Sequence, residues 1–201
     1  VTALLLLPLL GALAIAFIPK ANSTLIKQAS IATALFTAAL SILMAIRFKS
    51  GVDGYQFPEV RSWVSAFHIN YAVGVDGISL VLIVMTAILV PLVLLAGWHE
   101  SEGGRWSAKT FYILVLISET LMIGVFAATD LFLFYVIFEA MLIPVYFLIG
   151  GYGRGDRGAA ALKFLLYSLF GGLLMLAALI GTTALGAFWY WGFAAGRRGR
   201  S

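Results

Sequence analysis

Cysteine is absent from the 201 residues of this chain. Without cysteine the chain can form neither structural disulfides nor cysteine-ligated zinc or iron–sulfur centres. Histidine is nearly absent as well, and its two residues, His68 and His99, lie far apart in or near expected loops. We therefore expect no metal site and no cofactor in this chain.

Charged residues are also scarce. They make up 11% of the sequence, hydrophobic residues make up 62%, and the mean hydropathy is +1.03. Soluble domains are about 25% charged, so this chain has too few charges to cover a solvated surface, and we expect it to lie in a lipid bilayer. No glycine-rich phosphate motif follows an expected strand, which argues against nucleotide binding. The net charge of +4 indicates orientation in a membrane rather than a nucleic-acid partner.

Long apolar runs are what the sequence has instead. A helix needs about 20 mostly apolar residues to cross the hydrocarbon, and six stretches qualify. They are about 2–18, 25–46, 75–97, 109–127, 129–150 and 161–187. The predicted fold is all-α, a polytopic membrane protein with about six transmembrane helices. We expect two helices within 1–50, an extracytoplasmic loop over 51–74, four helices within 75–187 and a separate tail over 188–201.

The long loop carries aromatic residues at a regular spacing. Trp63, Phe67 and Tyr71 recur every four residues, which suits a helix lying in the membrane interface. Polar and β-branched residues between them also allow a short extended segment.

Lysine and arginine residues predict the orientation, because they concentrate in cytoplasmic loops. The first, third and fifth loops hold Lys20, Lys27, Arg105, Lys109, Arg154 and Arg157. The opposite side holds Arg47, Lys49 and Arg61, and the tail adds Arg197, Arg198 and Arg200, which levels the count. We give the internal loops more weight than the tail, so the N-terminus is expected outside the cytoplasm.

Glu139 is the most unusual residue of the apolar runs. It lies about ten residues into the stretch "LFLFYVIFEAMLIPVYFLIG", too deep for its short side chain to reach water. A carboxyl group there is protonated, paired or facing a hydrated cavity, which suits a proton relay; the alternative is a neutral Glu bonded to a neighbouring helix. Pro144 follows five residues later and predicts a kink that frees a backbone carbonyl near residue 140.

Two further ionisable residues lie within expected spans. Glu119 is about ten residues into the fourth span, at a depth similar to that of Glu139 on the next, antiparallel helix. Lys163 lies near the cytoplasmic start of the sixth span, where a structural lysine would extend its amine to the interface. For both residues a relay role and a structural role stay open.

Other polar or small residues have structural explanations. Asp76 and Asp130 stand where spans begin, and a carboxylate there caps the helix and complements its dipole. The Gly171–Gly172 pair suits close helix packing.

Three segments together resemble a known family. They are "YAVGVDGISLVLIVMTAILVPLVLLAGW", "ETLMIGVFAATDLFLFYVIFEAMLIPVYFLIGGYG" and "ALKFLLYSLFGGLLMLAAL". They are similar to the third, the fourth and fifth, and the sixth spans of chain M, also called chain 4, of the proton-pumping NADH:quinone oxidoreductase, respiratory complex I. Related complex I subunits and Mrp-type cation/proton antiporter subunits share the mid-span Glu, but "VPLVLLAGW" and "FEAMLIPVYFLIG" favour chain M.

The resemblance implies roles for three residues. Glu139 matches the fifth-span Glu that pairs with a seventh-span Lys, Glu119 matches an acidic residue of the fourth span, and Lys163 matches a sixth-span Lys. It also implies a bacterial inner membrane, complex I membrane-arm subunits as partners, and electron transfer and NADH binding elsewhere in the complex.

The chain also departs from the family, whose members have about fourteen spans. We expect this sequence to be an N-terminal portion whose residues 188–201 no longer resemble the family. The alternatives are an antiporter subunit of the Mrp type and a fragment that translocates nothing alone.

Overall fold

The computed structural model describes residues 1–51, 54–64, 69–100 and 106–198. The elements in chain order are α1 (Thr2–Phe17), α2 (Ser23–Arg47), β1 (Gln56–Val64), β2 (Ile69–Val75), α3 (Gly77–Glu100), α4 (Ala108–Ala127), α5 (Leu131–Tyr152) and α6 (Arg157–Arg198). The expected all-helical membrane architecture is confirmed, with one small hairpin added to it.

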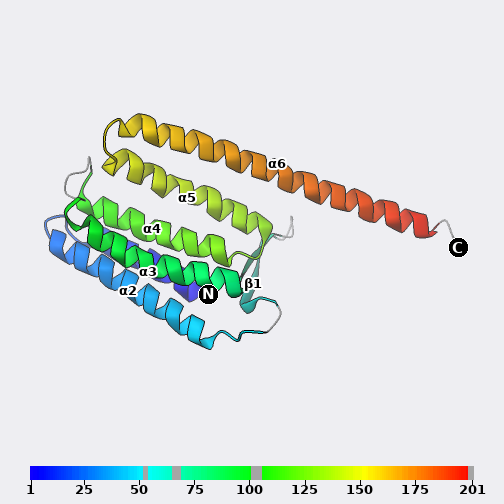
Figure 1. The fold of residues 1–201 in the computed structure, drawn as a ribbon, viewed down its shortest axis with the longest axis horizontal. Helices are drawn as coiled ribbons and strands as arrows, with labels where there is room; N and C mark the ends of the chain where they lie inside the picture. Colours follow the sequence, from blue (N-terminus) through cyan, green and yellow to red (C-terminus); the bar gives the residue numbers. More distant parts are fainter. Residues whose placement is uncertain (52–53, 65–68, 101–105, 199–201) are drawn as a thin grey trace.

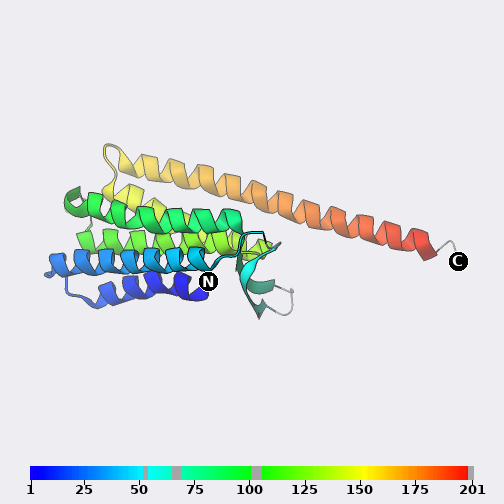
Figure 2. The same cartoon turned by 60° about the horizontal axis from the view of Figure 1, so that its bottom comes forward.

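The helices lie side by side, and α4 is at the centre of the bundle. It packs against α1, α3 and α5, and also touches α2. α5 lies between α4 and α6, so α6 is the outermost helix and continues well past the end of the bundle (Figures 1 and 2). The N-terminus lies at the same end of the bundle as the hairpin (Figure 1).

Five of the six helices are long and apolar enough to cross a membrane. The exception is α1, which has 16 residues. At 1.5 Å per residue it is about 24 Å long, less than the hydrocarbon thickness of about 30 Å. The expected first span is present as a helix over Thr2–Phe17. In contrast, α6 has 42 residues, of which Arg157–Thr182 form the candidate span.

The long loop folds into an antiparallel hairpin, so the expected interfacial helix is wrong and the extended alternative is correct. Trp63 belongs to β1 and Tyr71 to β2, while Phe67 lies outside the described residues. A four-residue spacing fits one face of a strand as well as one face of a helix, because strand side chains repeat every two residues. The hairpin is fixed to the bundle by the N–H of Thr129, which donates to the carbonyl of Ala72 at 2.9 Å.

Buried apolar side chains form two clusters at opposite ends of the bundle. One cluster includes Ile15, Leu94 and Tyr112, and the other, next to the hairpin, includes Val75 and Ile123. Large apolar side chains also cover the outside of the helices, as expected for surfaces that face lipid. On α6 this outer surface is extensive, and Tyr167 on it is 78% exposed.

Candidate functional site

Glu139 lies in the middle of α5, eight residues after its first residue, Leu131. The side chain is half-buried, and its Oε1 atom is buried without a hydrogen-bond partner among the described residues. The hydroxyl of Tyr135, one turn earlier on α5, interacts with the Glu139 carboxyl. Gly172 of α6 stands directly against the same carboxyl group. Glu139 therefore lies at the contact between α5 and α6.

Pro144 is buried inside α5, and the helix continues without interruption from Leu131 to Tyr152. The expected effect on hydrogen bonding applies nevertheless, because proline has no N–H to donate to the carbonyl of Ala140. An acceptor without its helical partner therefore lies next to Glu139 in the chain.

Glu119 is fully buried in α4, with 0% of its surface exposed. Neither of its carboxyl oxygens has a hydrogen-bond partner in the part of the chain that the structure describes. An ionised carboxylate in such a place is expensive, so the group is either neutral or solvated by water within the bundle.

The two carboxyl groups share a depth but do not touch. Glu119 is eight residues before the end of α4, and Glu139 is eight residues after the start of α5. Each therefore lies about 12 Å along its helix from the α4–α5 turn. Since both oxygens of Glu119 lack a partner among the described residues, no direct hydrogen bond joins the two groups. Any proton exchange between them needs intervening water or another group.

The structure places Lys163 on the side of α6 that faces away from Glu139. It is exposed on α6, nine residues before Gly172. Nine residues at about 100° each place the two positions on opposite faces of the helix. Because Gly172 faces α5, Lys163 points to the open side of α6.

The carboxylates at the starts of α3 and α5 serve as helix caps. The Oδ1 atom of Asp130 accepts from the N–H groups of Phe132 and Leu133 at 3.0 and 2.9 Å. Asp76 and Ser79 cap each other's backbone: the N–H of Ser79 donates to Asp76 Oδ1 at 2.7 Å, and the N–H of Asp76 donates to Ser79 Oγ at 2.8 Å. These contacts satisfy the first N–H groups of each helix.

Three cations at the opposite end have a role that the sequence reasoning missed, because it counted them only for orientation. Lys27 is 97% buried, and its Nζ atom donates to the carbonyl of Trp98 near the end of α3 at 2.7 Å. The Nζ atom of Lys109 donates to the carbonyls of Ala16 and Ile18 at the end of α1, both at 2.7 Å. The Nη1 atom of Arg157 donates to the carbonyl of Gly151 near the end of α5 at 3.4 Å. Each of the three cations sits where a helix dipole is negative. The sequence did contain a signal for this role, namely a basic residue at the start of a helix. In an antiparallel pair that residue lies beside the C-terminal end of the neighbouring helix.

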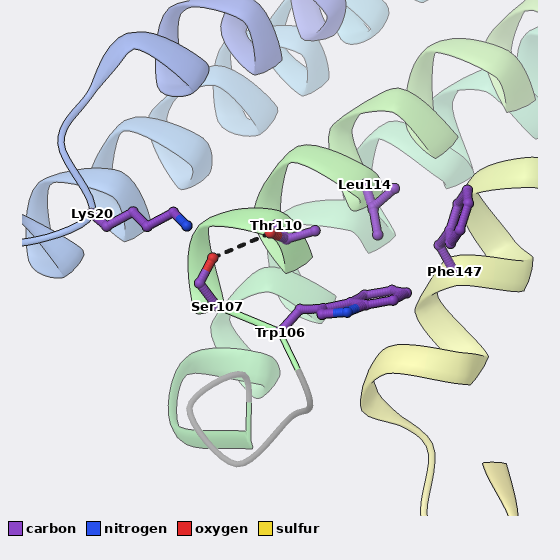
Figure 3. Close-up of a pocket in the computed structure, with 6 residues that line it drawn as sticks. All are labelled: Lys20, Trp106, Ser107, Thr110, Leu114 and Phe147. Atoms are coloured by element: carbon purple, nitrogen blue, oxygen red, sulfur yellow. Dashed lines mark hydrogen bonds between the residues drawn. The ribbon is translucent and has the colours of Figure 1, made fainter. Parts of the chain in front are cut away.

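A cavity of about 590 Å³ opens near the start of α4. Its lining consists of Lys20, Trp106, Ser107, Thr110, Leu114 and Phe147 (Figure 3). The hydroxyls of Ser107 and Thr110 are 3.2 Å apart. None of the three candidate relay residues lines this cavity, so it is separate from the Glu139 site.

A bundle of apolar helices with carboxyl groups at mid-helix depth defines a polytopic membrane protein that carries ionisable groups inside its helix bundle. Residues 128–187 match the transmembrane family of NADH:quinone oxidoreductases and Mrp antiporters. Residues 4–128 match the family described as NADH-ubiquinone oxidoreductase chain 4, amino terminus, and the chain belongs to this family.

Individual relatives agree with this family. The chain is 42% identical over 203 residues to NADH-quinone oxidoreductase subunit M of Mycobacterium tuberculosis, covering 88% of this chain and 37% of the relative. It is 40% identical over 178 residues to NADH-ubiquinone oxidoreductase chain 4 of Arabidopsis thaliana, covering 88% and 35%. Its fold matches a chain of respiratory complex I from Thermus thermophilus with a TM-score of 0.74 at 30% identity, covering 90% and 35%. The chain thus spans just over a third of the length of these relatives.

Proposed function

We propose that this chain is part of a membrane-arm subunit of a proton-pumping NADH:quinone oxidoreductase, and that the whole subunit translocates protons as quinone is reduced. Its partners are the neighbouring membrane-arm subunits and the lipid bilayer. Electron transfer and NADH binding take place in other subunits, and this chain holds no cofactor of its own. Membership of the chain 4 family supports the assignment over an Mrp-type antiporter, because the amino-terminal match is described for chain 4 alone.

The observation that carries the proposal is the environment of Glu139. Its Oε1 atom is buried at mid-helix depth and accepts no hydrogen bond from the described residues. A carboxyl group in such a place can bind or release a proton when its electrostatic surroundings change. The carbonyl of Ala140, which Pro144 leaves without its helical donor, supplies a place where a water molecule can bind beside it.

Glu119 and Lys163 extend the relay in opposite directions. Glu119 is enclosed by the central helix bundle, whereas Lys163 is exposed on the open side of α6. In this proposal Glu119 exchanges protons with Glu139 through water, and Lys163 exchanges charge with groups that cover α6 in the whole subunit. The 201-residue chain alone lacks the seventh-helix Lys that the resemblance implies, so we propose that it translocates nothing by itself.

Substituting Glu139 by Gln in the full-length subunit tests the relay. The substitution keeps the size and polarity of the side chain but removes the titratable proton. We expect proton transfer through this subunit to slow by about a hundredfold or more, as for loss of a positioned acid–base group, so that the assembled enzyme in proteoliposomes pumps fewer protons per electron. Proton uptake and quinone reduction are measured on the same vesicles.

The matched control is Asp156→Asn, which makes the same chemical change in an exposed turn. Liposomes that hold only the 201-residue chain give the background proton leak. Equal pumping by Glu139→Gln and Asp156→Asn at equal electron transfer would contradict the proposal.

A further inference from the structure

The two glycines in the middle of α6 have different surroundings. A methyl group added to Gly172 would overlap Oε1 of Glu139 and would lie 2.9 Å from its Cδ atom. A methyl group added to Gly171 would meet nothing within 4 Å. Of these two glycines, only Gly172 therefore makes room for a described side chain of another helix.

The group that fills this room is the Glu139 carboxyl. The three atoms nearest to a methyl group at Gly172 are all carboxyl atoms of Glu139, namely Oε1, Cδ and Oε2. If Gly172 served to bring two helix backbones together, the nearest atoms would belong to the backbone of α5. The space at Gly172 is therefore filled by the Glu139 carboxyl group and not by the backbone of α5.

We propose that Gly172 is a positioning residue for Glu139. The space left by the absent side chain of Gly172, which we call the notch, holds the carboxyl group between α5 and α6. Any side chain at this position would turn the carboxyl group away from α6. The inference rests on the proposed relay role of Glu139. According to this inference, the orientation of the Glu139 carboxyl is set by a residue of a different helix that has no titratable group of its own.

The notch also gives α6 a way to act on Glu139, although Lys163 of the same helix faces away from it. The Oε1 atom is buried and lacks a hydrogen-bond partner among the described residues. Contact with the α6 backbone then sets the position of this oxygen together with the Tyr135 hydroxyl, which interacts with the same carboxyl group. A small rotation or shift of α6 would move the notch and change the position from which Glu139 exchanges its proton.

The experiment compares four forms of the full-length subunit in the assembled, reconstituted enzyme. They carry Gly172→Ala, Gly171→Ala, Glu139→Asp, or Gly172→Ala together with Glu139→Asp. Alanine favours the helix over glycine at both positions, so the two single alanine variants differ only in their neighbours. Protons pumped per electron and the amount of assembled enzyme are measured for each form.

We expect Gly171→Ala to pump normally and Gly172→Ala to pump about tenfold less, because small misplacements of a reacting group are costly. Asp is one methylene shorter than Glu and withdraws from the added methyl. The double variant is therefore expected to pump at least as well as Glu139→Asp alone, which is non-additive rescue. A merely structural effect of Gly172→Ala would not be relieved by shortening Glu139.

Other outcomes separate this inference from the proposed function. If Gly172→Ala matches Gly171→Ala while Glu139→Gln stops pumping, the positioning role is wrong and the relay stands. If Glu139→Gln pumps normally, the proposed function itself is wrong. If Gly172→Ala prevents assembly, rescue of assembly by Glu139→Asp supports the notch, and failure of that rescue overturns it.

Discussion

Asp76 and Glu139 are both carboxylic acids, but their surroundings give them different tasks. The Oδ1 atom of Asp76 accepts from the N–H and the hydroxyl of Ser79, each at 2.7 Å. The backbone N–H of Ser79 contributes most to lowering the pKa of Asp76, followed by its hydroxyl. Saturation with donors fixes Asp76 in its charged form as a cap. The Oε1 atom of Glu139 has no such donors among the described residues, and the proposed proton exchange requires such an unsaturated carboxyl group.

Removal of the Asp76 side chain should weaken the start of α3. Asp76→Ala is expected to lower the free energy of unfolding by about 1 kcal/mol, the usual cost of a lost N-cap. Denaturant titration of the subunit in detergent measures it. The folded-state pKa is lowered, so the ionised cap stabilises the fold above about pH 3.9 and loses this effect as pH falls through the lowered pKa.

Asp76→Asn separates the cap from its charge. Asn keeps an acceptor for the N–H of Ser79, so the stability near pH 7 should fall by less than in Asp76→Ala, while the loss of stability as pH falls below about 3.9 disappears. An Asn variant with the acid sensitivity of the unmodified chain would show that another group is responsible.

At the scale of elements, charges complement the helices that run away from the hairpin. Carboxylates stand at the beginnings of α1, α3 and α5: Glu59 accepts from the N–H of Thr2 at 3.1 Å, and Asp76 and Asp130 accept as described. Cations reach the ends of the same helices. Three helices with the same direction thus have negative groups at one end and positive groups at the other, as their dipoles favour.

Lys109 tests this arrangement, because its amine satisfies two carbonyls at the end of α1. Lys109→Met keeps the apolar stem but removes the donor, and we expect a loss of about 1 kcal/mol in the free energy of unfolding. Lys109→Arg keeps the cation and should lose less than half of that. Lys20→Met removes a charge from the same side and serves as the control; a loss as large as that of Lys109→Met would point to net charge as the cause.

The sequence predicted the elements better than their contacts. Hydropathy located all six helices, because an apolar stretch of membrane length has no alternative to a helix in lipid. It could not distinguish a hairpin from a helix around Trp63 and Tyr71, since their spacing fits both. Hydropathy also could not predict the contact between Gly172 and Glu139, for a different reason. A helix that is apolar on all sides has no polar face to indicate how it is rotated against its neighbour.

At the scale of the whole molecule, the charged ends of the bundle bear on its orientation in the membrane. Lys27 and Lys109 were counted as cytoplasmic, and both bind helix carbonyls at the end of the bundle opposite the hairpin. Their position is therefore favoured by the helix dipoles as well as by the membrane. The helix dipoles favour these positions in either orientation of the bundle, so the predicted orientation, with the hairpin outside the cytoplasm, rests on the distribution of Lys and Arg alone.

The absence of cysteine makes this orientation directly measurable. Single cysteines replace Ala21, between α1 and α2, and Val60, which is 65% exposed in the hairpin. A maleimide that cannot cross membranes should label Val60→Cys from the outer face of the cytoplasmic membrane of bacterial cells and Ala21→Cys only in inside-out vesicles. Both should react after detergent solubilisation, which controls for accessibility. The opposite labelling pattern would place the N-terminus in the cytoplasm, and the basic end of the bundle would then owe its composition to the helix dipoles alone.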